Sequence, residues 1–385
     1  MNTALVSGAI ANKPGNGGEA WVRLSWALGL RRLGLDAWLI EEIAPEICRD
    51  REGRAASLEG SENLAWFRLV TEGFGLGDRS ALVLSDGSGA AGATVAELAD
   101  LASGADLLVN VSGNLRLEPL LSRPRRRLYV DLDPGYTQLW HASGALGSVL
   151  ERHHAFLTVG LEIGTPSCSV PTAGIRWRPV LPPWLLDEWP VAELANPSRF
   201  TTVGSWRGGY GRLEHDGRTY GQKAHEFRRF AEMPRRSPAV FEAALDIDPA
   251  DHADRTLLAE NGWQLVDPRV VAGDPWAYRR YIQGGGAEFS VAQGIYVETN
   301  SGWVGDRTAA YLASGMPALV QDTGLSRTIP TGEGLLTFRT LDEAIAGAEA
   351  IAGDYERHSR AARRIAEEQF DSDAVLTRLL DEALS

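Results

Sequence analysis

Long apolar runs, paired cysteines and an excess of positive charge are all missing from this sequence, and each absence argues against a class of protein. No run of about 18 uninterrupted apolar residues occurs, so we expect no membrane span. Cys48 and Cys168 lie far apart, which favours free thiols over a paired-cysteine metal site. The 38 Lys and Arg residues are outnumbered by 51 Asp and Glu residues, and the net charge of −13 argues against nucleic acid and anionic membranes as partners.

Several catalytic and targeting motifs are also missing. The sequence has no Walker A loop, no H-E-x-x-H metal motif and no G-x-S-x-G nucleophile elbow. We therefore expect no bound metal. The stretch MNTALVSGAIANKPG lacks the basic and apolar regions of a secretory signal peptide, which predicts a cytoplasmic protein.

The pattern of apolar stretches indicates an α/β protein with two domains. A length of 385 residues exceeds what one ordinary core holds. Short apolar stretches alternate with helical patterns over 4–180 and again from 200 onward, which is typical of parallel sheets covered by helices. The intervening stretch 182–199 carries four prolines, as in an interdomain linker.

We therefore predict two Rossmann-like, doubly wound domains at residues 1–195 and 196–385. In such sheets, ligands bind beyond the carboxyl ends of the strands, so the site is expected in the cleft between the domains. The chain is helical by composition from Leu341 onward, and its last helix is a candidate to pack back on the first domain.

A glycine-rich loop opens the first predicted helix, which spans about residues 19–33. Gly17 and Gly18 leave backbone N–H groups accessible next to the positive end of this helix, which suits an anion. A flexible loop without a ligand is the alternative. A dinucleotide fingerprint is not present, because the residue two positions after Gly8 is Ile10 instead of a second glycine. Glu41 or Glu42 could nevertheless imitate its ribose-binding acid.

Basic residues follow the strand predicted at 200–203. Ser205 and Arg207 lie in the loop GSWRGGY, and Lys223 begins the next predicted helix. A guanidinium and an ammonium that converge on one loop would bind a diphosphate, the former through paired hydrogen bonds and the latter as a point charge. Two solvated surface charges are the alternative.

The stretch SGWVGDRTAAYLASGMPALVQDTG, residues 301–324, combines a turn, a helix and a strand. Arg307 lies in the first turn of the helix, where a cation opposes the helix dipole unless an anion offsets it. Asp306 beside it is either part of an anion site or an N-cap. The candidate residues of this stretch are Ser301, Gly302, Asp306, Arg307 and Thr323.

Two carboxylates follow the strand predicted at 128–130 in the first domain. Asp131 and Asp133 are therefore candidates for the base that deprotonates an acceptor hydroxyl. Alternatively, they cap the turn that Pro134 and Gly135 favour.

Three stretches resemble the nucleotide-sugar-dependent glycosyltransferases of the GT-B fold, especially divergent family-4-like (group 1) members. They are GNGGEAWVRLSWALGLRRLGLDAWLI, FTTVGSWRGGYG with YGQKAHEF, and the block that ends in Gly315-Met316-Pro317. In this family the first stretch opens the acceptor domain, the second holds the donor diphosphate and the third binds the nucleotide sugar. The family's two glutamates of the third block correspond to Gly302 and Ala310.

The resemblance implies a glycosyltransferase that moves a sugar from a nucleoside-diphosphate-sugar to a hydroxyl group. We expect a small-molecule acceptor, no metal, and no cofactor apart from the nucleotide sugar as co-substrate. Arg207, Lys223 and Arg307 would stabilise the leaving diphosphate. A nucleotide-sugar epimerase of the same fold, or a catalytically silent nucleotide-sugar-binding protein, are the alternatives.

Overall fold

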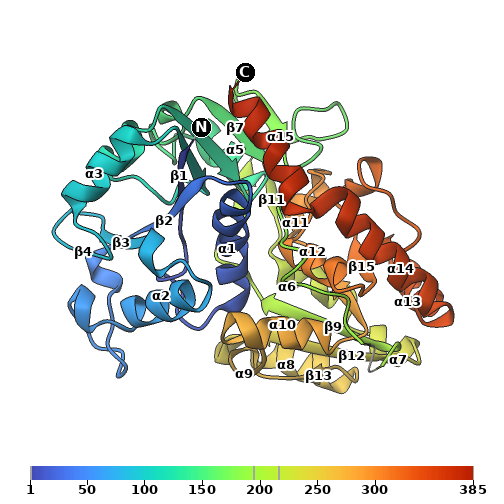
Figure 1. The fold of residues 1–385 in the computed structure, drawn as a ribbon. Helices are drawn as coiled ribbons and strands as arrows, with labels where there is room; N and C mark the ends of the chain where they lie inside the picture. The colour runs from blue at the N-terminus through green and yellow to red at the C-terminus, as the bar shows by residue number, and fades with distance from the viewer. Residues whose placement is uncertain (1, 194–195, 216, 385) are drawn as a thin grey trace.

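The computed structural model describes residues 2–193, 196–215 and 217–384, and it contains two open sheets with helices on their faces (Figure 1). The first sheet has the strand order β4-β3-β2-β1-β5-β6-β7-β8, and every pair except β3–β4 is parallel. Its strands are β1 (Thr3–Ser7), β2 (Asp36–Ile43), β3 (Ser80–Leu84), β4 (Ala90–Ala91), β5 (Leu107–Val111), β6 (Arg126–Asp131), β7 (Ala155–Thr158) and β8 (Trp177–Pro179).

The helices of the first half of the chain (residues 2–193) include some that begin at a capping side chain. Asn16 accepts a hydrogen bond from the N–H of Glu19 at the start of α1, and Thr94 and Glu97 form a capping box at α3. These helices are α1 (Gly17–Arg32), α2 (Glu62–Gly73), α3 (Val95–Gly104), α4 (Glu118–Ser122) and α5 (Tyr136–Ala142).

The second sheet has the strand order β13-β12-β9-β14-β15-β16 and is parallel throughout. A short antiparallel hairpin, β10 (Leu213–His215) with β11 (Arg218–Tyr220), lies in the connection that follows β9. The strands of the sheet are β9 (Arg199–Ser205), β12 (Val240–Asp246), β13 (Gln264–Leu265), β14 (Ala287–Ser290), β15 (Ala318–Gln321) and β16 (Leu335–Phe338). The two predicted parallel sheets are thus confirmed.

The helices of the second half (residues 196–384) contact this sheet or one another, and the last one leaves them for α1. They are α6 (Lys223–Arg228), α7 (Met233–Arg236), α8 (His252–Glu260), α9 (Pro268–Ala272), α10 (Pro275–Gln283), α11 (Gly294–Glu298), α12 (Asp306–Ala313), α13 (Leu341–Gly353), α14 (Tyr355–Ile365) and α15 (Ser372–Leu384). None of the helices within the described residues combines the length and the apolar character needed to cross a bilayer.

The last helix, α15, returns to the first half and lies along α1 (Figure 1). Val375, Leu376 and Leu379 are buried in the core that also contains β1, β2 and β5. The predicted division between residues 195 and 196 touches positions 194 and 195, which lie outside the described residues, so this boundary stays a prediction.

The two halves also meet where α1 packs against α10. Trp21 of α1 is fully buried, and its indole N–H donates a hydrogen bond of 2.7 Å to the carbonyl of Pro275. Its ring centroid lies 5.1 Å from that of Trp189, in the proline-containing connection between the sheets. This contact brings the carboxyl ends of β1 and β9 close to each other.

Candidate functional site

A central cavity of about 420 Å³ lies between the two halves at the carboxyl ends of their strands. Both halves contribute lining residues, so the cavity occupies the position expected for the site of a doubly wound fold. Its charged and aromatic lining residues are Lys13, Glu19, Arg23, Asp133, Tyr210, Tyr296, Trp303 and Asp306.

A second space of about 210 Å³, which we call the β9 cavity, lies on the other side of the start of α1. Gly18 lines the β9 cavity and the next residue, Glu19, lines the central cavity, so only the first turn of α1 separates them. The residues of the second half that line the β9 cavity are Val203, Gly204, Ser205, Asp246, Pro268, Arg269, Ala272 and Tyr278.

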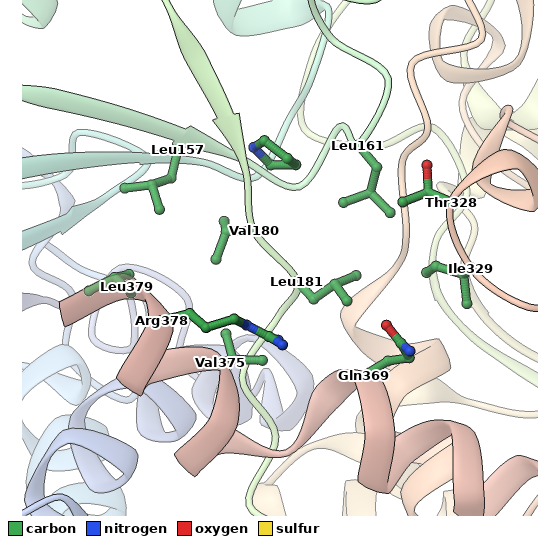
Figure 2. A pocket seen from close by; sticks show the side chains of 11 residues that line it. Leu157, Leu161, Val180, Leu181, Thr328, Ile329, Gln369, Val375, Arg378 and Leu379 are labelled. Atoms are coloured by element: carbon green, nitrogen blue, oxygen red, sulfur yellow. The ribbon is translucent and has the colours of Figure 1, made fainter. Parts of the chain in front are cut away.

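A third cavity, of about 230 Å³, lies where α15 crosses from one half to the other (Figure 2). It is lined mainly by aliphatic side chains such as Leu157, Val180 and Leu379, and Arg378 is its charged lining residue. None of the residues predicted from the sequence to form the site lines it, so we do not regard it as the candidate site.

Lys223 and Arg307 converge at the end of β9. A Cβ atom on Gly204 would lie 3.3 Å from Arg307 Nη1 and 3.6 Å from Lys223 Nζ. Burial, and then the neighbouring Arg307 charge, lower the pKa of Lys223 to about 7. Within the part of the chain that the structure describes, the Lys223 ammonium has no hydrogen bond or ion pair. An anion beside Gly204 would therefore stabilise both charges.

Arg307 is held in place by hydrogen bonds to two strands of the second sheet, β9 and β14. Its Nε donates to Glu288 Oε1 at 2.7 Å and its Nη2 to Ser290 Oγ at 2.7 Å, and its Nη1 donates to the carbonyl of Val203. The Glu288 side chain is fully buried. Glu288 is thus the anion that offsets the positive charge of Arg307 in the first turn of α12. The presence of an arginine at this position therefore does not require a bound ligand.

Asp133 lines the central cavity at the end of β6. Its carboxylate accepts hydrogen bonds from the hydroxyl groups of Tyr210 and Tyr296, at 3.0 and 3.1 Å. Burial, and then the charge of Asp131, raise the pKa of Asp133 to about 6. A carboxylate with this pKa is mostly ionised at neutral pH and can accept a proton.

Asp131 has a different position and is fully buried. Its two oxygens accept four hydrogen bonds, from the Asp133 N–H, the hydroxyls of Thr137 and Thr158, and the amide of Gln138. These contacts hold the turn after β6. The geometry therefore favours the capping alternative for Asp131 and the cavity-facing role for Asp133.

Asp306 also lines the central cavity, at the first position of α12. The N-cap of this helix is Gly305, so Asp306 does not serve as the cap. Burial, and then the charge of Glu19, raise the pKa of Asp306 to about 7, while Arg23 acts in the opposite direction. Asp306 and Asp133 thus face one cavity from opposite halves of the chain.

The comparison with known proteins gives matches among solved structures only. No family model and no curated protein matches this chain. An alpha-glucosyltransferase in complex with UDP and a 13-mer DNA superposes with a TM-score of 0.60 at 11% identity, over 100% of both chains. Anabaena HepE in complex with UDP-glucose superposes with a TM-score of 0.61 at 13% identity, over 99% of both chains.

AviGT4, a glycosyltransferase involved in avilamycin A biosynthesis, gives a TM-score of 0.58 at 12% identity, over 100% of this chain and 97% of the other. The chain has the GT-B fold. At these identities the similarity establishes the architecture, which confirms the predicted fold class.

In this GT-B chain Arg207 does not join Lys223. Its guanidinium forms a two-pronged ion pair with Asp251, with Nε and Asp251 Oδ2 2.7 Å apart, and also contacts Gln222 at 3.3 Å. The side chain is 44% exposed. The predicted convergence of Arg207 and Lys223 is therefore not seen, and Arg307 takes the place beside the lysine.

The glycine pair at the start of α1 is explained by packing. A Cβ atom on Gly17 would lie 2.1 Å from the carbonyl oxygen of Asp274, and one on Gly18 would lie 2.9 Å from the ring of Tyr278. Both contacts belong to the α10 region of the second half. Gly17 therefore permits close approach of the two halves, whereas Gly18 and Ser205 line the β9 cavity.

Ser301, Gly302 and Thr323 hold the turn before α12 against the first half. The carbonyls of Ser301 and Gly302 accept hydrogen bonds from the N–H groups of Glu162 and Leu161. The Gly302 N–H donates to the carbonyl of Thr323 at 2.8 Å, and Gly302 has a φ of +73°, a conformation that favours glycine. These residues fix the position of α12 and do not line either cavity.

The backbone N–H groups of the loop after β1 are hydrogen-bonded to the Glu41 carboxylate. Glu41 accepts hydrogen bonds from the N–H groups of Ile10, Ala11 and Asn12 at 2.6, 2.9 and 2.9 Å. A pyrophosphate would need these same N–H groups in a dinucleotide-binding domain. This arrangement argues against the dinucleotide alternative.

Arg23 and Glu19 belong to the central cavity but were not among the residues predicted from the sequence. The Arg23 side chain is 3% exposed, and it pairs with Glu19 one turn earlier at 3.0 Å. Its Nε and Nη1 have no hydrogen-bond partner among the described residues. A charged pair spaced by four residues inside a densely apolar helix is a signal that sequence analysis could have used. Tyr210 and Tyr296 had no comparable signal.

No group of three or more His, Cys, Asp or Glu side chains suited to a metal ion occurs within residues 2–193, 196–215 and 217–384. The expectation of a metal-independent reaction is not tested by this observation and stays a prediction.

Proposed function

We propose that this protein is a glycosyltransferase that transfers a sugar from a nucleoside-diphosphate-sugar to a hydroxyl group of a small-molecule acceptor. The observation that carries the proposal is the convergence of Lys223 and Arg307 on Gly204, a residue that lines the β9 cavity. Two of the similar structures, the alpha-glucosyltransferase and HepE, contain UDP and UDP-glucose respectively, which supports a donor of this class.

The three parts of such a donor match the three parts of the site. The nucleoside would occupy the β9 cavity, which the ends of β9 and β12 line. The diphosphate would lie beside Gly204, against Lys223 and Arg307. The sugar would extend past the first turn of α1 into the central cavity, where the acceptor also enters.

The reaction in this arrangement needs a base and stabilisation of the leaving group. The acceptor oxygen forms a bond to the anomeric carbon while the bond from that carbon to the diphosphate oxygen breaks. The acceptor proton passes to the Asp133 carboxylate, and the electron pair of the broken bond stays on the diphosphate. Lys223 and Arg307 stabilise the negative charge that develops there.

The central cavity favours a small acceptor over a nucleic acid. Three carboxylates (Glu19, Asp133 and Asp306) and two cations (Lys13 and Arg23) line it, and both cations pair with Glu19. A phosphate backbone would meet net negative charge there. No cofactor other than the donor enters the scheme. Metal independence and a cytoplasmic location stay predictions, and the former requires that turnover survive excess EDTA.

A thermal-shift screen over UDP-, GDP-, ADP- and dTDP-sugars tests the proposal. A donor at 100 times its Kd should stabilise the folded protein by about 2.7 kcal/mol. The Lys223→Met variant should lose this stabilisation, and the matched Arg207→Met variant should keep it because Arg207 pairs with Asp251. If none of these sugars raises the melting temperature, the proposal is wrong.

A catalytically silent nucleotide-sugar-binding protein is the second candidate. Ala310 supports it, because this residue is fully buried and has no carboxylate where the resembling family has a glutamate. A protein of this kind would bind the donor in the thermal-shift screen without releasing nucleoside diphosphate in the presence of any acceptor.

A further inference from the structure

Two tyrosines of the second half direct their hydroxyl groups at one carboxylate of the first half. Tyr210 lies in the connection after β9 and donates to Asp133 Oδ2 at 3.0 Å. Tyr296 lies on α11 and donates to Asp133 Oδ1 at 3.1 Å. Each carboxylate oxygen thus has its own donor, and both donors come from across the boundary between the halves.

Aromatic packing holds both phenol rings in place. The Tyr210 ring lies 4.7 Å from the Trp140 ring, edge-on, and 5.0 Å from the Tyr136 ring. The Tyr296 ring stacks on Trp303 at 4.8 Å, and Tyr296 is 4% exposed. Rings fixed in this way present their hydroxyl groups without a further loss of side-chain freedom.

The other charged groups around Asp133 are carboxylates, which disfavour its ionised form. Asp131 lies two residues away on the same strand end, and Glu19 of α1 also raises the pKa of Asp133. Asp306 of α12 faces the same cavity and interacts with Asp133. Tyr129 and Tyr136 are close to Asp133 but make no hydrogen bond with it.

No Lys or Arg side chain forms an ion pair with Asp133 in the part of the chain that the structure describes. The hydroxyl donors that favour its charged form are therefore Tyr210 and Tyr296. Burial, and then the charge of Asp133, raise the pKa values of both tyrosines above the ordinary value, so both stay protonated donors.

We infer that Tyr210 and Tyr296 are positioning residues that keep the half-buried Asp133 carboxylate charged and oriented toward the acceptor. This inference rests on the proposed function, in which Asp133 accepts the acceptor proton. The tyrosines do not lose or gain a proton in the step. Their hydrogen bonds lower the pKa of Asp133 and so oppose the effect of burial on this base.

The pH profile of kcat/KM tests the inference with the variants Tyr210→Phe and Tyr296→Phe. Loss of a hydrogen bond to the charged form raises the pKa of Asp133, so the acidic limb should move to higher pH by about one unit in each variant. Tyr136→Phe is the matched control, because its ring packs in the same cluster without a hydrogen bond to Asp133. Profiles that match that of Tyr136→Phe would overturn the inference.

A second readout does not depend on turnover. Asp133 has a pKa of about 6 in the folded protein, against about 3.9 in an unfolded chain. The folded state therefore binds the proton more tightly, and stability from this group falls as the pH rises from about 4 to 6. In the phenylalanine variants this fall should extend about one pH unit higher.

Melting temperatures of the three variants between pH 5 and pH 8 measure this effect. The difference between each test variant and Tyr136→Phe removes the contributions of all other groups. If no nucleotide sugar is turned over but the melting curves shift as expected, the proposed function fails and the hydrogen bonds to Asp133 stand. If turnover occurs and neither readout shifts, the positioning role fails and the proposed function stands. Tyr210→Phe, in a less buried connection, decides the matter if Tyr296→Phe does not fold.

Discussion

At the scale of single residues, Lys223 shows how burial makes the charge of a side chain depend on whether an anion is bound. An exposed lysine would be fully charged at neutral pH, whereas burial and the neighbouring Arg307 lower the pKa of Lys223 to about 7. Without a ligand, Lys223 is therefore only partly protonated near pH 7. A bound diphosphate would stabilise the charged form and raise this pKa again.

The affinity for a nucleoside diphosphate should consequently depend on pH. Binding takes up a proton above pH 7, so the affinity should fall by up to about tenfold per pH unit between pH 7 and pH 9. Calorimetry in buffers of different ionisation enthalpy measures both the affinity and the proton uptake. Lys223→Met should remove the uptake, and proton uptake that persists in this variant would assign it to another group.

Glu288 is the second residue with a measurable role at this scale. It is fully buried and pairs with Arg307, whose side chain is 14% exposed. Glu288→Gln leaves the charge of Arg307 without its partner, which should destabilise the protein by about 3 kcal/mol in urea unfolding. The exposed pair of Glu356 and Arg360 gives the control, because Glu356→Gln should leave the unfolding midpoint unchanged. Equal midpoints for both variants would contradict the role of Glu288.

At the scale of elements, the contact between α1 and α10 determines how closely the halves approach. A Cβ on Gly17 would meet the Asp274 carbonyl oxygen at 2.1 Å, and this backbone atom cannot move without shifting the start of α10. Gly17→Ala should therefore destabilise the protein by about 1–3 kcal/mol, as overpacking typically does.

Gly104 at the end of α3 is the matched control for this substitution. A Cβ there meets nothing within 4 Å, so Gly104→Ala should be neutral or slightly stabilising. Chemical denaturation of the two variants measures the difference. A Gly17→Ala protein as stable as Gly104→Ala would mean that the halves do not pack as closely as the contact indicates.

The elements themselves were largely predictable, because local patterns determine them. The strand predicted at 128–130 is the middle of β6. The helix predicted at about 19–33 is α1, and both of its ends are shifted by one or two residues. The hairpin of β10 and β11 was not predicted, since its short polar strands pair only with each other.

The site was less predictable than the elements, because partners distant in sequence decide it. Lys223 and Arg307 were both candidates, but the sequence does not show that Glu288 pairs with the latter or that Asp251 pairs with Arg207. The tyrosine contacts to Asp133 connect positions 77 and 163 residues apart, which no local pattern encodes.

At the scale of the whole molecule, α15 joins the end of the chain to its beginning. Leu376 is fully buried, and its Cδ1 lies within 2.5 Å of where a Cβ on Gly29 of α1 would be. Leu376→Ala should destabilise the protein by about 2–5 kcal/mol, as for other buried leucines. Urea unfolding followed by circular dichroism measures this loss.

Arg378, on the same helix and exposed, serves as the control, and Arg378→Ala should unfold at the wild-type midpoint. If Leu376→Ala is as stable as this control, α15 does not hold the first half in the way that the structure shows.

The most direct test of the central claim is the release of nucleoside diphosphate from a nucleotide sugar, measured with and without candidate acceptors. The wild-type protein should release it from at least one donor, more rapidly with an acceptor. Lys223→Met should abolish the release and Arg207→Met should preserve it. A folded wild-type protein that releases nucleoside diphosphate from no donor, or a Lys223→Met variant that is as active as the wild type, would contradict the account.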